Sequence, residues 1–256
     1  MSHTLDVLIL RLDAPLMSFG APIVDQQGKI QAFPAQSLIS GLVANALGYD
    51  RSEHQRLAQL QRRLRYAVRE DRTGQKITDY QTVDLTTPHM SSYVWTKSGR
   101  KKRRSKIKNK PREILHRDYW ADTIHTVALT LDTVDEEPTL DDVEHAVQYP
   151  ARPLFIGRKT CLPATPLFVK RMQVNRLRDA LADPETLSGR ADKRSKYPAW
   201  WPVDENDPTP NKDDPAKENI RKPVTDRRDW QNQIHVGDRW VAEGEIEVIK
   251  DKESHD

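Results

Sequence analysis

Cysteine is nearly absent from this 256-residue chain, which contains only Cys161. A single thiol cannot form an internal disulfide, and this usage is typical of a reducing compartment. It also excludes a structural zinc site with several sulfur ligands, and the eight histidines show no paired metal-ligand spacing. We therefore expect neither a metal nor another cofactor.

Long apolar stretches and common catalytic motifs are missing as well. No apolar run approaches the ~20 residues that a membrane span requires. The first residues lack the basic and apolar regions of a secretory signal, so we expect a cytoplasmic protein without membrane contact. The chain has no phosphate-binding Walker loop and no G-x-S-x-G elbow, so no motif assigns a catalytic residue.

Positive charge, by contrast, is concentrated in residues 97–117, named here the basic segment. Its only acid is Glu113, so it carries a formal charge of +10, whereas the whole chain carries +3 and the remainder therefore −7. Such a cluster repels itself and gains most by meeting a polyanion. Its eleven bases are Lys97, Arg100, Lys101, Lys102, Arg103, Arg104, Lys106, Lys108, Lys110, Arg112 and Arg117.

Aromatic residues flank the basic segment, with Tyr93 and Trp95 before its bases and Tyr119 and Trp120 just after them. Lysine and arginine neutralise phosphates, and aromatic rings offer stacking faces for unpaired bases. The combination favours nucleic-acid binding over the alternative, a solvated basic loop.

Hydrophobic patterning predicts strands and helices in alternation. Residues 5–12 are apolar on both faces, as in a covered central strand. A helical stripe starts at Pro34 and stops at Gly48. Thr139 caps a later helix that ends before Pro150. The other expected elements are a short helix after a capping box at 52–55, strands at 66–71, 77–85, 120–131, 153–156 and 167–174, and a last strand at 240–249 paired near 234–236.

Strand, helix, strand, strand, helix, strand is the order of ferredoxin-like and RNA-recognition (RRM-like) domains. We therefore predict an α+β fold of this kind, with the basic segment inserted between its second and third strands. Residues 184–233 are rich in proline, aspartate and lysine, which indicates a long, loop-rich excursion. We expect this excursion to pack only on a partner, through Trp200, Trp201 or Trp230.

Three further places are candidates for function. In residues 153–161, Gly157 allows a close backbone approach and Arg158 and Lys159 would clamp phosphate; the alternative is a tight turn with two exposed bases. The loop 16–20 offers a stacking or approach loop at Phe19 and Gly20, or else Met17 and Phe19 are core residues. His116 could act as a general base or acid, or be one more RNA contact.

Several of these segments together resemble one family. They are Leu8-Ile-Leu-Arg-Leu12, Ala14-Pro-Leu-Met-Ser-Phe-Gly20, Phe33-Pro34 with Ser37, Gly41-Leu-Val-Ala-Asn-Ala-Leu-Gly48, Tyr66-Ala-Val-Arg69, Asp79-Tyr-Gln-Thr-Val83, Arg117-Asp-Tyr-Trp-Ala-Asp122 and Pro153-Leu-Phe-Ile-Gly-Arg-Lys-Thr-Cys161. In this order and register, over about residues 5–170, they are similar to the CasD family, the Cas-five subunit of the type I-E CRISPR surveillance complex called Cascade. The C-terminal third matches poorly.

The resemblance implies a modified ferredoxin-like, repeat-associated RNA-binding fold with an inserted thumb. The core would comprise residues 1–85 and 117–183, the basic thumb 86–116, and a loop-rich C-terminal extension with a final strand pair 184–256. It implies a non-catalytic subunit that holds the 5′ handle of the CRISPR RNA (crRNA) in antiviral defence. The implied partners are the backbone (Cas-seven) subunit and the large subunit, and the strong basicity adds target DNA as a further candidate.

Family motifs carry over handle-binding roles to Met17, Ser18, Gly20, Gln81, Arg117, Gly157, Arg158 and Lys159. Family members often have a basic or small polar pair where this chain has Ala35 and Gln36, which weakens the expectation of a phosphate contact there. Type I-C relatives do cut RNA, so the alternative is a metal-independent endoribonuclease that uses His116. A third hypothesis is a structural assembly subunit with incidental basicity.

Overall fold

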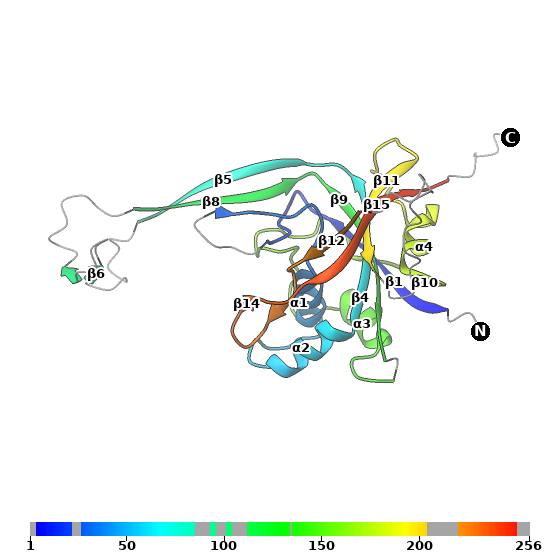
Figure 1. Cartoon of the computed structure of the whole chain (residues 1–256), viewed down its shortest axis with the longest axis horizontal. Coiled ribbons are helices and arrows are strands. Elements are labelled where there is room, and N and C mark those ends of the chain that lie inside the picture. The colour runs from blue at the N-terminus through cyan, green and yellow to red at the C-terminus, as the bar shows by residue number, and fades with distance from the viewer. Residues whose placement is uncertain are drawn as a thin grey trace.

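The computed structural model describes residues 4–21, 27–84, 93–95, 101–103, 112–133, 135–203 and 220–249. It is a mixed α/β fold built on antiparallel sheets, with a long two-stranded projection at one side (Figure 1). Its helices are α1 (Gln36–Ala46), α2 (His54–Arg63), α3 (Leu140–Gln148), α4 (Leu177–Ala182) and a short 3-10 turn at Pro184–Thr186.

Seven strands form the main sheet, and each neighbouring pair is antiparallel. In spatial order they are β10 (Phe168–Val174), β1 (Leu5–Asp13), β9 (Ile124–Leu131), β4 (Leu64–Arg72), β11 (Lys196–Pro202), β15 (Arg239–Glu247) and β12 (Ile220–Val224).

Both faces of this sheet are covered, as the apolar pattern of residues 5–12 predicts. Leu8 and Leu10 of β1 pack into the larger core with residues of α1, α2 and α3. Val7 and Ile9 point to the smaller core, which contains Leu181 of α4. Because side chains alternate along a strand, β1 serves both cores at once.

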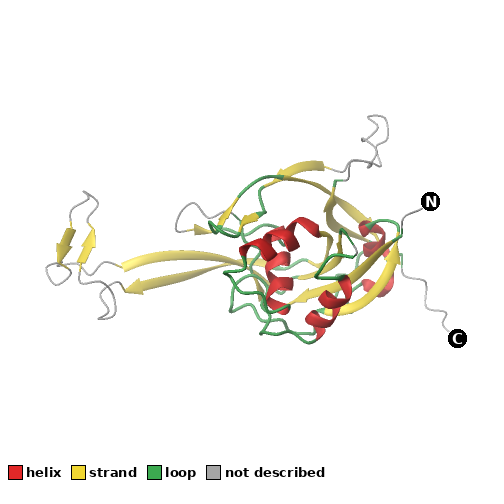
Figure 2. Cartoon of the chain, turned by 90° about the horizontal axis from the view of Figure 1, so that it is seen from below, coloured by secondary structure: helices red, strands yellow, loops and turns green. Residues whose placement is uncertain are grey.

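A second sheet holds β2 (Leu16–Met17), β3 (Gln27–Gly28), β5 (Gln75–Asp84) and β8 (Arg112–Ala121). The β5–β8 ladder leaves the body between β4 and β9 and extends far from it in both views (Figures 1 and 2). Smaller pairs are β6 (Tyr93–Trp95) with β7 (Lys101–Arg103), and β13 (Arg228–Asp229) with β14 (Ile234–His235).

Several expected elements are confirmed. The Thr139 cap of α3 is a full capping box, because the Asp142 N–H donates to the Thr139 hydroxyl and the Asp142 carboxylate accepts from the Thr139 N–H. Gly48 follows α1 with a φ of +79°, the left-handed conformation that glycine adopts at helix ends. The strands at 77–85 and 167–174 correspond to β5 and β10.

Other boundaries were wrong. α1 begins at Gln36, two residues after Pro34, and α2 has Glu53 at its N-cap without a side-chain cap, so the capping box at 52–55 does not form. The single strand expected at 120–131 is two strands in different sheets, because Asp122 turns the chain with a φ of +56°.

The expected strand at 153–156 is also wrong, since these residues are a loop. The edge position beside β1 is taken by β10, and the loop instead closes on itself through the bond from Ile156 N–H to the Cys161 carbonyl at 2.8 Å. The last strand, β15, pairs with β11 and β12 rather than with residues near 235, which pair with β13.

Two of the tryptophans that were expected to pack only on a partner protein are instead buried within this chain, so that prediction was wrong for them. Trp200 and Trp201 are 5% and 6% exposed, and they lie on β11 on opposite faces of the main sheet. Trp230 packs partly buried against the larger core. The polar residues around them gave no sign of a strand. Each ring fills a core formed by segments that are distant in the sequence, and a local pattern does not show such a core.

Candidate nucleic-acid interface

Strand β8 is the centre of the sheet from which the projection arises. It pairs with β5 through ten residue pairs, from Gln75 opposite Ala121 to Asp84 opposite Arg112. Near the body it also pairs antiparallel with β2 and parallel with β3. Arg117 is therefore flanked by Asp79 on β5 and Gly28 on β3. We call this place, where β2, β3 and β5 meet β8 beside the body, the junction.

The loop after β2 anchors this junction in the core. Met17 and Ser18 are buried, and Gly20 forms an isolated bridge to Ile30. Phe19 is fully buried with its ring edge-on to His125, the ring centroids 4.9 Å apart. The interpretation of Met17 and Phe19 as core residues is thus confirmed, and little of their surface is open to a ligand.

His125, which packs against that loop, is buried without charge. Burial lowers the pKa of its imidazole to about 4, against weaker opposing effects of Glu70 and Asp71. Its Nδ1 lies 3.4 Å from the Thr123 hydroxyl. The neutral ring is therefore a packing residue beside the junction and a source of pH-dependent stability.

Gly157 makes the closest backbone contact at the junction. Its φ is +95°, and a Cβ at this position would lie 1.9 Å from the Ser18 carbonyl oxygen. The Ser18 N–H donates to the Ile156 carbonyl at 3.2 Å, which joins the two loops. The close approach predicted for Gly157 is thus made to Ser18 of the same chain, while its RNA contact stays a prediction.

Arg158 ties the same loop to the projection. Its guanidinium donates to the carbonyls of Asp118 at 2.9 Å and Gly28 at 3.2 Å, and lies 4.5 Å from the centre of the Tyr119 ring. Three directional contacts to β3 and β8 hold it in place. Arg158 is therefore a positioning residue at the foot of the projection, whereas the neighbouring Lys159 is exposed.

The middle of the β5–β8 ladder carries an exposed aromatic pair that sequence reasoning missed. Tyr80 is 59% exposed and its ring lies 5.4 Å from that of His116, directly opposite in the ladder. The signal was available, since an aromatic residue inside a polar strand segment seldom serves a core. Beside it, the Gln81 amide donates to the Asp79 carboxylate at 2.6 Å.

Closer to the body, charge on the ladder is balanced locally. The Lys76 ammonium lies 2.7 Å from the Asp118 carboxylate, which also accepts from the Thr78 hydroxyl at 2.7 Å. The hydrogen bond from Lys76 is the main cause that lowers the pKa of Asp118. Arg117 differs, because the buried Nε of this half-buried residue has no hydrogen-bond partner within the part of the chain that the structure describes.

Only part of the basic segment lies within the described residues. Lys101, Lys102 and Arg103 form β7, whose backbone pairs with β6, so that Tyr93 faces Arg103 and Trp95 faces Lys101 in the register. Arg112 begins β8. Six predicted contacts lie outside the described residues, namely Lys97, Arg100, Arg104, Lys106, Lys108 and Lys110.

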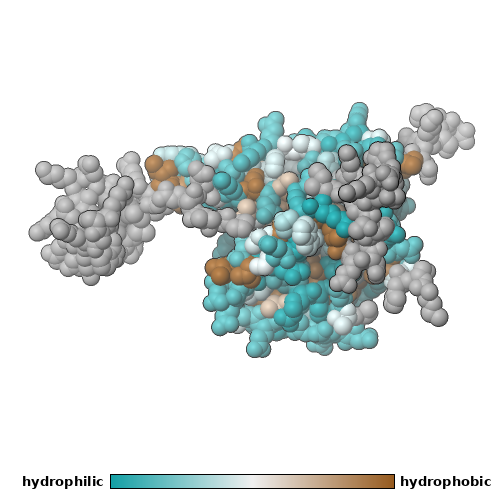
Figure 3. Space-filling model, viewed as in Figure 1, coloured by the Kyte–Doolittle hydropathy of each residue, from teal (hydrophilic) through white to brown (hydrophobic). Residues whose placement is uncertain are grey.

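The structure thus separates the predicted contacts into two groups. Met17, Ser18, Gly157 and Arg158 meet at the junction, with Arg117 on the adjoining strand. The bases of β7 belong to the small β6–β7 pair beyond the ladder (Figure 1). The face of the described residues in Figure 3 is mainly hydrophilic, with apolar residues in small separate groups, so a charged partner suits it better than an apolar one.

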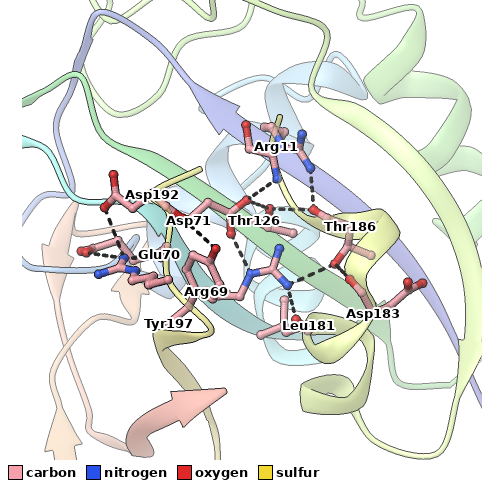
Figure 4. Close-up of polar contacts among 12 residues, drawn as sticks. Arg11, Arg69, Glu70, Asp71, Thr126, Leu181, Asp183, Thr186, Asp192 and Tyr197 are labelled. Carbon is pink, nitrogen blue, oxygen red and sulfur yellow. Dashed lines mark hydrogen bonds and ion pairs between the residues drawn. The ribbon is translucent and has the colours of Figure 1, made fainter. Parts of the chain in front are cut away.

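A dense polar cluster elsewhere in the molecule is structural. Arg69 and Asp71 are fully buried and their Nε and Oδ1 atoms lie 2.7 Å apart (Figure 4). Asp71 also accepts from the Thr126 hydroxyl at 2.8 Å and the Ser188 N–H at 3.0 Å. This network attaches residues 181–192 to the main sheet and leaves no open surface for a substrate.

Two absences hold for the described ranges. No group of three or more histidine, cysteine, aspartate or glutamate side chains is placed to hold a metal ion there. Within the same ranges, every helix is too short or too polar to cross a bilayer.

Comparisons with known proteins agree with this geometry. The family described as "CRISPR-associated protein (Cas_Cas5)" matches residues 7–242. The chain is 30% identical over 182 residues to "CRISPR system Cascade subunit CasD" of Escherichia coli (strain K12), covering 71% of this chain and 78% of that protein.

Two solved structures share the fold. A chain of a "CRISPR RNA-guided surveillance complex" has a TM-score of 0.67 at 22% identity, covering 94% of this chain and 90% of that one. The structure described as "Crystal structure of Cas protein" has a TM-score of 0.59 at 23% identity, covering 94% and 95%.

Proposed function

Because the chain belongs to the Cas5 family of CRISPR-associated proteins, we propose that it is a non-catalytic, crRNA-binding subunit of a Cascade-type surveillance complex. The relative that shares 30% identity with it is described as a Cascade subunit. The observation that carries the proposal is the β5–β8 ladder with the basic strand β7 beyond it. A positively charged strand that projects from the body is accessible to a polyanion, and its charges do not have to be buried in the core.

In this proposal the 5′ handle of the crRNA contacts both groups of residues. Lysines and arginines of the basic segment neutralise phosphates, and exposed aromatic residues such as Tyr80 stack unpaired bases. The junction positions the ladder through Arg158 and Gly157. Lys159 and Gly20 supply contacts near its base, and Gln81 supplies one along the ladder. The chain would cap the complex beside its backbone and large subunits, with target DNA as a further contact.

We also propose a ferredoxin-like core for this RNA-binding role. The four strands β10, β1, β9 and β4 lie side by side, all antiparallel, with α1 after the first strand in the sequence and α3 after the third. With it we propose a division into a core (1–85 and 117–183), a thumb (86–116) and an extension (184–256). β11, β12 and β15 of the extension enlarge the sheet beyond β4.

One observation favours the alternative function, RNA cleavage. His116 is exposed and adjoins Tyr80, so an imidazole and a phenol lie together on the ladder, and these groups serve as acid and base in metal-independent ribonucleases. The guide-binding proposal nevertheless explains more of the molecule. The many lysines and arginines of the basic segment suit phosphate binding, whereas they form no defined pair for proton transfer.

A gel assay separates the two functions. The purified protein is incubated with labelled CRISPR-repeat RNA in EDTA and resolved on native and denaturing gels, beside His116→Ala. We expect a shifted, intact RNA for both proteins. Cut RNA that disappears in His116→Ala would establish the nuclease, and an unshifted RNA would overturn guide binding by the free subunit.

A further inference from the structure

A second basic site lies at the end of the main sheet remote from the ladder. There β1 and β4 begin and β10 and β11 end, whereas the ladder starts beyond the other end of β4. In Figure 1 the strand β10 and helix α4 lie on the opposite side of the body from the projection. A pocket of about 60 Å³ opens at this end, lined by Leu5, Arg65, Asn175, Arg176, Leu177, Arg178, Trp201 and Pro202.

Three arginines line the pocket and only two are close to a carboxylate. Arg65 lies 3.7 Å from Asp132, and Arg178 lies 4.0 Å from Asp179, both at partly exposed positions. Arg176 is exposed, and its side chain has no ion pair or hydrogen bond within the described ranges, although its carbonyl accepts from the Asp179 N–H at 3.0 Å. The pocket therefore retains an uncompensated positive charge that suits one negative group.

Its walls narrow the chemistry of that group. Leu5, Leu177 and Pro202 give an apolar lining, and Arg178 lies 6.0 Å from the centre of the Trp201 ring. The guanidinium groups of Arg176 and Arg178 offer donors to a compact anion with several acceptor oxygens, and guanidinium groups match phosphate oxygens in pairs.

We propose that this pocket binds one backbone phosphate of a nucleic-acid strand that the protein also contacts at the ladder. This inference rests on the proposed RNA-binding function and adds to it a second, separate contact. The nine residues of β1 span roughly 30 Å at about 3.3 Å each. That separation exceeds the Debye length of about 10 Å at 0.1 M salt, so the two sites contribute independently.

The test compares Arg176→Gln with Arg62→Gln, a matched change of an exposed arginine on α2. Affinity for CRISPR-repeat RNA is measured from 50 to 200 mM salt. We expect Arg176→Gln to reduce the slope of log affinity against log salt by about one contact, or roughly 0.7 to 0.9. Arg62→Gln should leave the slope unchanged, and both variants should melt like the wild type.

A second arm uses inorganic phosphate alone and follows the melting temperature of each protein. If phosphate stabilises the wild type but not Arg176→Gln, while the RNA slope is the same for both, the pocket takes free phosphate and the nucleic-acid proposal is overturned. An unchanged slope without a phosphate effect overturns the site altogether.

The two proposals fail separately. If the wild type does not bind RNA, the proposed function of the free subunit fails, and the phosphate arm alone then decides whether the pocket is an anion site. If the wild type binds RNA and Arg176→Gln binds it with the same slope, the guide-binding function stands and the pocket has no part in it.

Discussion

Replacing Gly157 by alanine should destabilise the protein far more than a single methyl group normally does. The φ of +95° is a backbone conformation that costs a residue with a Cβ about 1–3 kcal/mol. The added Cβ would also lie 1.9 Å from the Ser18 carbonyl oxygen, so one of the two loops must move by roughly 1.5 Å to reach an ordinary contact distance.

That movement breaks the bond from the Ser18 N–H to the Ile156 carbonyl, which contributes about 1 kcal/mol. Together the two effects amount to about 2–4 kcal/mol. Arg158 follows Gly157 directly, so the same movement pulls its guanidinium from the carbonyls of Asp118 and Gly28. We therefore expect weaker RNA binding as well as lower stability.

Urea unfolding of the variant measures this loss, with Gly189→Ala as the matched control. Gly189 has open space around its Cα and no positive φ, so its substitution should change stability between zero and a gain of about 1 kcal/mol. If Gly157→Ala unfolds within about 0.5 kcal/mol of the wild type at an unchanged slope against urea, the tight contact with Ser18 does not exist in solution.

Three further outcomes follow. Arg158→Lys keeps the charge but loses the guanidinium that donates to two carbonyls, so we expect the free energy of unfolding to fall by about 1–3 kcal/mol in thermal unfolding. Lys159→Met should leave stability unchanged. If both variants were equally stable, Arg158 would not hold the ladder in place. Asp71→Asn leaves the Arg69 guanidinium buried without its counter-charge and should cost about 3–5 kcal/mol in urea unfolding, and a loss below 1 kcal/mol would contradict the buried network in Figure 4. The folded pKa of His125 is about 4, below its ordinary value of 6.5, so the unfolded chain binds the proton first and stability is lost as pH falls through 6.5 toward 4. Between pH 7 and 5 this loss should be about 2 kcal/mol, and His125→Phe should remove it; the same pH slope in both proteins would show that the ring is charged or exposed.

Local sequence patterns were sufficient to predict the elements that depend only on neighbouring residues. Residues 5–12 are apolar throughout, and this composition directly indicates a strand covered on two faces, as β1 is. The helix stop at Gly48 and the capping box at Thr139 depend on residues within one turn of the chain. Such signals need no knowledge of distant contacts.

Contacts between distant segments were not predictable in the same way. A strand at 153–156 fits the local pattern, but β10 takes the edge of the sheet and Ser18 holds the loop instead. Trp200 and Trp201 stand in a polar stretch, and only the cores on either side of β11 make them interior residues. Propensity yields to tertiary packing at both places.

The candidate site also has one part that was predictable from the sequence and another that depends on the fold. The basic segment was evident from charge alone. The role of Arg158 as a link between β3 and β8 depends on three backbone segments that only the fold brings together. The polar neighbours of Tyr80 indicated an exposed ring, but its pairing with His116 depends on the register of β5 against β8.

The salt dependence of crRNA binding tests the central claim most directly. Affinity for labelled repeat RNA is measured from 50 to 200 mM salt for the wild type and for a variant with Lys101, Lys102 and Arg103 of β7 changed to glutamine. We expect the wild-type affinity to fall about a thousandfold, as for about six neutralised phosphates, and the variant to show a clearly shallower slope. A flat response of the wild type, or the same slope in both proteins, would contradict guide binding through the basic segment.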